Sequence, residues 1–385
     1  MIQRTNIRVL HQKLGHYPAV VLVGPRQCGK TTLAKSLPGI HYFDLEKEAD
    51  QLRLDLEWGR LVATEQCVVL DEAQTCPKLF PRLRGAIDDD RKRNGRFLLL
   101  GSVSPALMRN IAESLAGRLA ICEQTPFHAT EMPCERWDDL WCLGGYPDGG
   151  VLEAARFPGW QMDYLSLLAQ RDFPIWGLAA HPATTLRLLK MLAAVNGQQW
   201  NASQIGGSMG LSYHTINHYL EFLEQAFLIR RIPAWSGNNA KRLVKTPRVY
   251  WRDSGLCHAL LGLQSPGALL DQPWVGNSWE GWVIEQVLTA FQLAGIHTDA
   301  YWARTHGQNE VDLFVTFGNE RWAIEIKLTA HPKPDDFRGL RNMNELLKPT
   351  RRIVVSRTRD CVWNQEEASV NVKGLLDHIS EFNWR

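Results

Sequence analysis

The residues best suited to chemistry lie near the start of the chain, where the pattern G-x-x-x-x-G-K-S/T runs from Gly24 to Thr31. An apolar run at 19–23 precedes the pattern and predicts a buried strand, and a short helix is predicted over 31–37. This context is typical of a loop that binds nucleotide phosphates. Backbone N–H groups would surround the β-phosphate, Lys30 would reach the β- and γ-phosphates, and the Thr31 hydroxyl would hold Mg²⁺. The predicted nucleotide contacts are Gly24, Pro25, Arg26, Gln27, Cys28, Gly29, Lys30, Thr31 and Thr32.

Two carboxylates follow a second apolar run, at 67–70. Asp71, at the tip of this predicted strand, would bind Mg²⁺ through its water shell, and Glu72 would polarise the water that attacks the γ-phosphate. Ser102 follows a third predicted strand and is a candidate to touch that water or the γ-phosphate. Capping of the next helix is an equally good interpretation of Ser102. The pattern predicts an ATPase that uses ATP and Mg²⁺.

Arg118 is a candidate to stabilise charge in the transition state, either within its own chain or from a neighbouring subunit. A solvated arginine at the end of a helix is the alternative interpretation. Further elements, a strand at 41–45 and a helix at 78–89, complete an alternating pattern of strands and helices. This pattern predicts an α/β fold with a mostly parallel sheet.

The middle of the chain predicts a helix-turn-helix, with one helix in 201–210 and the next opening at Leu211–Thr215 under a Ser212 cap. Two predicted strands, at 228–234 and 244–251, would complete a winged helix. The second helix carries polar groups but no Lys or Arg, so contact with the DNA backbone through the wing is favoured over sequence reading. A protein-docking role for the winged helix is the alternative. The candidate DNA contacts are Tyr213, His214, Asn217, Lys241, Arg242 and Lys245.

The last third contains a second group of carboxylates. Glu325 and Lys327 are two positions apart on a predicted strand and therefore share one face, where Asp312 from a neighbouring strand can join them. Glu280 can approach from a helix that begins near Ser278. Two carboxylates and a lysine can bind Mg²⁺ and activate water for phosphodiester cleavage. An exposed ion pair between Glu325 and Lys327 is the alternative.

Two resemblances follow from these motifs. The segments GPRQCGKTT, FDLE, VVLDEAQ, LLLGS and SLAGR, in that order, resemble the prokaryotic AAA-type P-loop ATPases with a DUF4143-type C-terminal region, over nearly the whole chain. This resemblance implies an ATPase with an additional catalytic glutamate, here Glu72, and a homo-oligomer that is often a ring. Residues from about 275 to 360 resemble the PD-(D/E)xK nucleases, with Asp312 and Glu325-x-Lys327 in the motif positions and Val311 in place of the usual proline.

The chain is long enough for several domains. We expect a P-loop AAA-type ATPase domain at 1–132, a helical linker or lid at 133–180, a winged-helix domain at 181–255 and an α/β nuclease-like domain of the restriction-endonuclease type at 256–385. A net charge of +2 excludes a uniformly basic nucleic-acid binder, so any contact with DNA must come from local patches. The eight cysteines show no C-x-x-C pair, and no apolar run suits a signal peptide or a membrane span. These features favour a cytoplasmic protein without a membrane partner.

The combined prediction is an oligomeric ATPase that acts as a motor on duplex or branched DNA and recognises it by backbone shape. One alternative is an ATP-gated, Mg²⁺-dependent nuclease that cuts with the C-terminal carboxylates. Another is an ATP-dependent switch that binds a protein partner and no nucleic acid.

Overall fold

The computed structural model describes residues 2–101, 113–236, 243–307 and 309–382. Its contacts divide the chain into two compact units. The first unit comprises residues 1–127, 170–179 and 221–228, and the second comprises residues 128–169, 180–220 and 229–385. Ser102, Lys241 and Arg242, all predicted site residues, lie outside the described residues.

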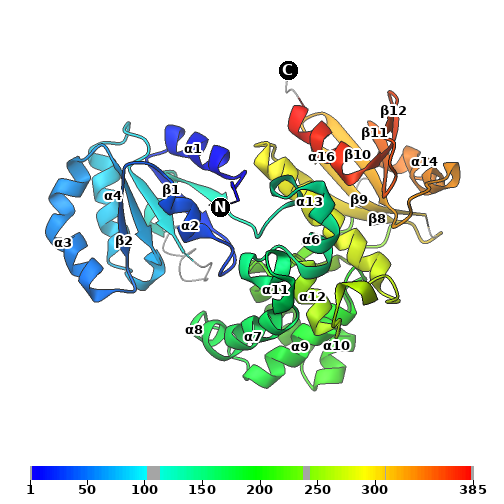
Figure 1. Ribbon diagram of the computed structural model, residues 1–385, viewed down its shortest axis with the longest axis horizontal. Helices are drawn as coiled ribbons and strands as arrows, with labels where there is room; N and C mark the ends of the chain where they lie inside the picture. The colour runs from blue at the N-terminus through cyan, green and yellow to red at the C-terminus, as the bar shows by residue number, and fades with distance from the viewer. Residues whose placement is uncertain (1, 102–112, 237–242, 308, 383–385) are drawn as a thin grey trace. The chain divides into compact units, whose positions relative to one another are not determined.

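The first unit contains a parallel five-stranded sheet in the order β2-β3-β4-β1-β5 (Figure 1). Its strands are β1 Ala19–Val23, β2 Ile40–Asp44, β3 Cys67–Asp71, β4 Phe97–Leu100 and β5 Leu119–Glu123. Its helices include α1 Ile7–His16, α2 Lys30–Lys35, α3 Glu48–Ala63 and α4 Leu79–Asp89. The predicted α/β fold and parallel sheet are confirmed, while β5 was not predicted. The parallel order brings the carboxyl ends of β1 and β3 to one edge of the sheet, where the phosphate loop and Asp71 meet.

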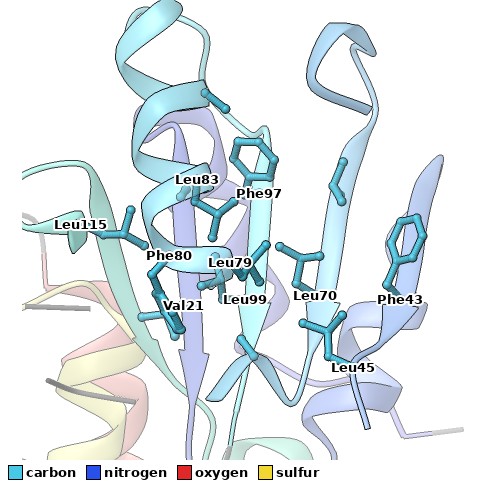
Figure 2. Close-up of a cluster of buried hydrophobic side chains, with 14 of the residues drawn as sticks. Val21, Phe43, Leu45, Leu70, Leu79, Phe80, Leu83, Phe97, Leu99 and Leu115 are labelled. Carbon is cyan, nitrogen blue, oxygen red and sulfur yellow. The ribbon is translucent and has the colours of Figure 1, made fainter. Parts of the chain in front are cut away.

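Residues of α3 and α4 share one buried cluster with this sheet, and Figure 2 shows the side chains of α4 against the strands. Leu79 and Leu83 of α4 pack against Leu70 of β3 and Leu99 of β4, and all four side chains are buried. The strands are apolar on both faces because helices cover both, as is usual for parallel sheets. This packing fixes the strand ends that carry the candidate active site.

The described middle of the chain is mainly helical and includes α6 Trp137–Leu143, α7 Gly159–Leu167, α9 Pro182–Ala194, α10 Ala202–Met209, α11 Tyr213–Gln225 and α12 Ser254–Leu260. Gly210 ends α10 in the left-handed conformation, with φ of 69°. The Ser212 hydroxyl accepts a hydrogen bond from the Thr215 N–H at 3.1 Å, so Ser212 caps α11. The predicted pair of helices joined by a tight glycine turn is present. An antiparallel pair follows it, β6 Ile229–Ile232 and β7 Arg248–Trp251.

The C-terminal part of the second unit contains a six-stranded sheet in the order β12-β13-β11-β10-β9-β8 (Figure 1). Its strands are β8 Asp299–Arg304, β9 Glu310–Phe317, β10 Glu320–Ile326, β11 Arg351–Ser356, β12 Val362–Trp363 and β13 Glu367–Asn371. The long helix α13 Val275–Leu293 packs Phe291 against Trp322 of β10, with ring centroids 5.6 Å apart, and also contacts α16 Val372–Glu381. Leu340 of α14 Arg338–Asn342 and Leu347 of α15 Asn344–Leu347 belong to a second buried cluster on the sheet.

Candidate active site

The phosphate loop follows β1 and closes around the side chain of Lys30. Gly24 has φ of 151° and Gly29 has φ of 95°, conformations that favour glycine. The Lys30 ammonium is buried and donates to the carbonyl oxygens of Gly24 and Pro25, at 2.9 and 2.8 Å. Because an ammonium has three donors, one remains for a phosphate oxygen. The loop therefore holds a buried cation, and its role in phosphate binding stays a prediction.

Other residues of the loop fix its backbone to the rest of the first unit. Cys28 is buried, its thiol donates to the Gln124 carbonyl at 3.3 Å, and burial raises the pKa of this thiol. Arg26 pairs with Asp172, which belongs to the same unit. Gln27 and Thr32 are exposed. Their side chains are therefore free of packing constraints within the chain.

Arg4 holds the loop from outside the motif. Its guanidinium donates to the Cys28 carbonyl at 2.9 Å and to the Thr125 carbonyl at 2.6 Å, so it ties the phosphate loop to the segment after β5. No sequence pattern indicates this role, because Arg4 lies outside every nucleotide-binding motif.

Thr31 and Asp71 meet at the carboxyl ends of the strands. The Thr31 hydroxyl donates to Asp71 Oδ2 at 2.8 Å, and the Tyr42 hydroxyl donates to the same oxygen at 2.6 Å. A hydroxyl and a carboxylate are oxygen ligands of the kind that Mg²⁺ prefers, so this pair fits the predicted metal. Tyr42 was not predicted as a site residue. Tyr42 lies two residues before Asp44 on β2, so the two side chains share one face of the strand, and Asp44 pairs in register with Asp71. Side-chain alternation along this predicted strand was the sequence signal that could have identified Tyr42.

Glu72 follows Asp71 in a strained backbone conformation, with φ of 51° and ψ of 45°. Its N–H donates to Asp71 Oδ1 at 3.0 Å, and its carboxylate accepts a hydrogen bond from Gln74. Burial raises the pKa of Glu72, against the opposing effects of the Gln74 hydrogen bond and the Lys30 charge. A raised pKa makes a carboxylate a better general base near neutral pH. Strain at a non-glycine residue is frequent at functional sites.

Arg118 lies at the other edge of this sheet. It immediately precedes β5, and Leu119 pairs in register with Ala19, the first residue of β1. Its guanidinium makes a bidentate pair with Asp88, near the end of α4, at 2.8 and 2.9 Å. A strand of five residues is about 15 Å long, so Arg118 does not reach the phosphate loop within its own chain. The geometry argues against a role for Arg118 in its own active site. A contribution of Arg118 to the active site of a neighbouring subunit stays a prediction.

The candidate DNA contacts differ in their exposure. Tyr213 and His214 are exposed at the start of α11, with ring centroids 3.9 Å apart and the ring planes tilted by 41°. Lys245 is exposed, whereas Asn217 is half-buried and accepts a hydrogen bond from the Trp200 indole at 2.8 Å. Tyr213, His214 and Lys245 therefore stay candidate DNA contacts. The side-chain oxygen of Asn217 is already engaged by Trp200.

The structure also gathers the C-terminal residues that were predicted to bind a metal. Lys327 donates to Glu325 at 2.5 Å, and Asp312 accepts a hydrogen bond from the Ile326 N–H at 2.8 Å. Glu280 approaches from α13, where it accepts hydrogen bonds from Arg248 and Tyr250. Burial, followed by the charge of Asp312, raises the pKa of both Glu280 and Glu325 to about 8. Within the described ranges no three His, Cys, Asp or Glu residues are arranged to hold a metal ion, and the Mg²⁺ site at these residues stays a prediction.

Among the described residues, no helix is both long and apolar enough to cross a membrane. All eight cysteines are free thiols.

Three family models match successive parts of the chain. An AAA domain matches residues 16–133, a domain of unknown function (DUF8612) matches residues 134–267, and a domain of unknown function (DUF4143) matches residues 275–373. The first and third matches confirm the resemblance to AAA-type ATPases with a DUF4143 region. The winged-helix and nuclease-like assignments stay predictions.

Two mycobacterial proteins are similar over most of the chain. They are the uncharacterized protein Rv2008c of Mycobacterium tuberculosis and the uncharacterized protein Mb2031c of Mycobacterium bovis. Each is 35% identical over 328 residues, which cover 84% of this chain and 73% of the relative. Among solved structures, the STAND protein with a tetratricopeptide repeat sensor, PH0952 from Pyrococcus horikoshii, is 14% identical. That match covers 76% of this chain but only 45% of the other, and its TM-score of 0.28 is too low to establish a shared fold.

The family is shown by the level of identity and coverage with the mycobacterial relatives. The chain belongs to the same family as these two proteins, and it combines an AAA domain of the P-loop ATPase type with a C-terminal DUF4143 domain.

Proposed function

We propose that this protein hydrolyses ATP at the edge of the first sheet and uses the reaction to act on DNA. The observation that carries the first part is the convergence of Lys30, Thr31, Asp71 and Glu72. These residues would supply a phosphate-binding cation, two oxygen ligands and a half-buried carboxylate base. Each has a distinct role in phosphoryl transfer to water.

In the proposed reaction, water attacks the γ-phosphorus and the bond to the β–γ bridging oxygen breaks, giving ADP and phosphate. Glu72 accepts the proton of the attacking water, and Lys30 contacts the phosphate oxygens. Thr31 and Asp71 would hold Mg²⁺, which when bound offsets phosphate charge. The hydrogen bond from Tyr42 orients Asp71 for this role.

The proposal for DNA rests on the surface formed by α10, α11 and the segment before β7. Tyr213 and His214 at the start of α11 can contact phosphates or base edges, and Lys245 adds an exposed positive charge. The sequence of α11 contains no Lys or Arg, which favours recognition of backbone shape over base sequence. We propose duplex or branched DNA as the substrate. The protein would work in the cytoplasm as a homo-oligomeric motor, with Arg118 a candidate to act on a neighbouring subunit.

Charge reversal at Lys245 tests whether this residue contacts DNA. Binding to a labelled duplex would be measured by fluorescence anisotropy at several salt concentrations, for the wild type, Lys245→Glu and Lys190→Glu. Lys190 is an exposed lysine of α9 and serves as the matched control. Loss of a phosphate contact at Lys245 should weaken binding and reduce the slope of log K against log salt by about 1, while Lys190→Glu should do neither. Equal effects of the two variants would contradict the assignment.

The absence of Lys and Arg from α11 also favours a second candidate function, an ATP-dependent switch that docks a protein partner through this helix. The two functions are separated by whether hydrolysis responds to DNA. A DNA motor requires stimulation that weakens with salt, whereas a protein switch hydrolyses ATP at a rate that DNA does not change.

A further inference from the structure

Four carboxylates from three elements gather in the second unit. Glu280 lies on α13, Glu310 and Asp312 lie on β9, and Glu325 lies on β10. We call these four residues the carboxylate cluster. Their side chains range from 8% exposed at Asp312 to 26% exposed at Glu310. Buried carboxylates repel one another and require compensating positive charge.

Much of that charge comes from Arg248, a buried arginine on β7. Its Nη1 donates to Glu280 Oε1 at 2.9 Å and lies 3.6 Å from Asp312 Oδ1, and its Nη2 donates to Glu310. The guanidinium also lies 4.4 Å from the centre of the Trp302 ring, which faces it as in a cation–π contact. One cation therefore contacts three of the four carboxylates.

Two further oxygens of the cluster accept hydrogen bonds from other donors. Asp312 Oδ2 accepts the Ile326 N–H, and Glu325 Oε1 accepts Lys327. In the described part of the chain, Glu325 Oε2 is buried without a hydrogen-bond partner. Mg²⁺ requires near-octahedral coordination by several oxygens, and in each member of the cluster one carboxylate oxygen is already held by a protein donor. A divalent ion would also have to displace Arg248 or bear its repulsion at close range.

We propose that Arg248 is the resident cation of the carboxylate cluster and takes the place of a divalent metal. The second unit then binds no catalytic Mg²⁺ at these residues and does not cut DNA with them. The inference is independent of the proposed ATPase and DNA functions, because every contact that carries it lies within the second unit.

Neighbouring arginines also tie the β6–β7 strand pair to α13. Arg230 on β6 and Arg252 just after β7 both pair with the buried Glu285 of α13, at 2.7 and 2.6 Å. Arg248 does the same with Glu280, so both strands of the β6–β7 pair are tied to α13 through buried ion pairs. The cluster thereby fixes the strand pair, and the Lys245 segment before β7, to the six-stranded sheet.

Titration of Mn²⁺ into the nucleotide-free, full-length protein at pH 8 tests the proposal. The number of bound ions would be counted by electron paramagnetic resonance for the wild type, Asp312→Asn, Arg248→Met and Arg252→Met. We expect the wild type and Asp312→Asn to bind Mn²⁺ equally, because any weak binding comes from Asp71 and not from the cluster. Arg248→Met should gain one ion, since the cluster then lacks its cation. Arg252→Met is the matched control for loss of a buried arginine and should gain none.

Two results would overturn the proposal. One is a Mn²⁺ ion bound by the wild type and lost in Asp312→Asn, and this comparison stands even where Arg248→Met does not fold. The other is an Arg248→Met protein that folds, as judged by circular dichroism, and gains no ion. Mg²⁺-dependent cutting of DNA by the wild type that Asp312→Asn abolishes would count as the first result.

Discussion

At the scale of single residues, Asp71 Oδ2 accepts two hydrogen bonds, from the hydroxyls of Thr31 and Tyr42. Thr31 is part of the phosphate-loop pattern, whereas Tyr42 contacts Asp71, the proposed metal ligand, from a neighbouring strand. Partners of this kind orient a ligand and raise its affinity for the metal. Tyr42 is therefore a positioning residue for the proposed reaction.

Tyr42→Phe removes one hydrogen bond and leaves the ring in place. We expect the Mg²⁺ concentration that gives half-maximal ATP hydrolysis to rise about tenfold, because Asp71 loses a partner that fixes its orientation. Tyr17→Phe is the control, since Tyr17 is exposed and outside the site. An unchanged Mg²⁺ dependence in Tyr42→Phe would show that Thr31 alone positions Asp71.

His258 gives a second test at this scale, through the pH dependence of stability. The ring is fully buried, with Nδ1 2.8 Å from the Cys142 carbonyl and Nε2 2.5 Å from the Ser278 hydroxyl, and burial lowers the pKa of His258 to about 4. The unfolded chain therefore takes up this proton at a higher pH than the folded protein does. The stability from the neutral ring is present above pH 6.5 and is lost as the pH falls from about 6.5 to about 4, by an amount on the order of 2 kcal/mol.

The measurement is urea unfolding of the wild type, His258→Gln and His297→Gln at several pH values. His297 is exposed and serves as the control. The fall in stability below pH 6.5 should be shallower in His258→Gln alone. Asp253, whose pKa is raised to about 6 by burial, acts in the opposite direction and is common to all three proteins. Parallel pH profiles for the three proteins would refute the role of His258.

At the scale of elements, the phosphate loop depends on how closely it approaches β5. A Cβ atom on Gly24 would lie 2.1 Å from the Gln124 carbonyl oxygen, and its φ of 151° is rarely adopted by other residues. Gly24 thus lets the loop backbone pass the segment after β5, and Arg4 ties the same two segments together.

Gly24→Ala should abolish nucleotide binding, measured with a fluorescent ATP analogue, and should destabilise the first unit. The matched control is Gly85→Ala in α4, where a Cβ meets nothing within 4 Å. That change should raise the free energy of unfolding by about 0.5–1 kcal/mol, because alanine favours a helix over glycine, and should leave binding intact. Normal ATP binding by Gly24→Ala would mean that the loop adopts another conformation in solution.

Some strands and caps could be predicted from sequence patterns, and others could not. Buried strands next to the phosphate loop are uniform apolar runs, so β1, β3 and β4 were predictable, as was the Ser212 cap between α10 and α11. The strand β5 alternates less clearly, with Ile121 exposed, and was not predicted. Of the C-terminal sheet, only β9 and β10 were predicted, because chemically distinctive residues marked them.

At the scale of the whole molecule, the unpredicted features are contacts between residues far apart in the sequence. Asp71 and Glu72 followed from local pattern, but Arg248 meets Glu280 and Glu310 across 32 and 62 positions. No local pattern encodes these contacts, so the sequence pattern marked the carboxylates but not the guanidinium that contacts them. The AAA domain and the DUF4143 domain were both foreseeable, because ordered motifs mark each of them.

The proposed function requires Glu72 to act as the base for ATP hydrolysis that responds to DNA. Phosphate release would be measured for the wild type and Glu72→Gln, without DNA and with linear duplex or four-way-junction DNA, over a range of salt. We expect hydrolysis by the wild type, stimulation by DNA that weakens as salt rises, and a loss of at least about 100-fold in Glu72→Gln with ATP binding retained. Hydrolysis that persists in Glu72→Gln would contradict the assigned catalytic base, and hydrolysis that no DNA changes would contradict the DNA motor.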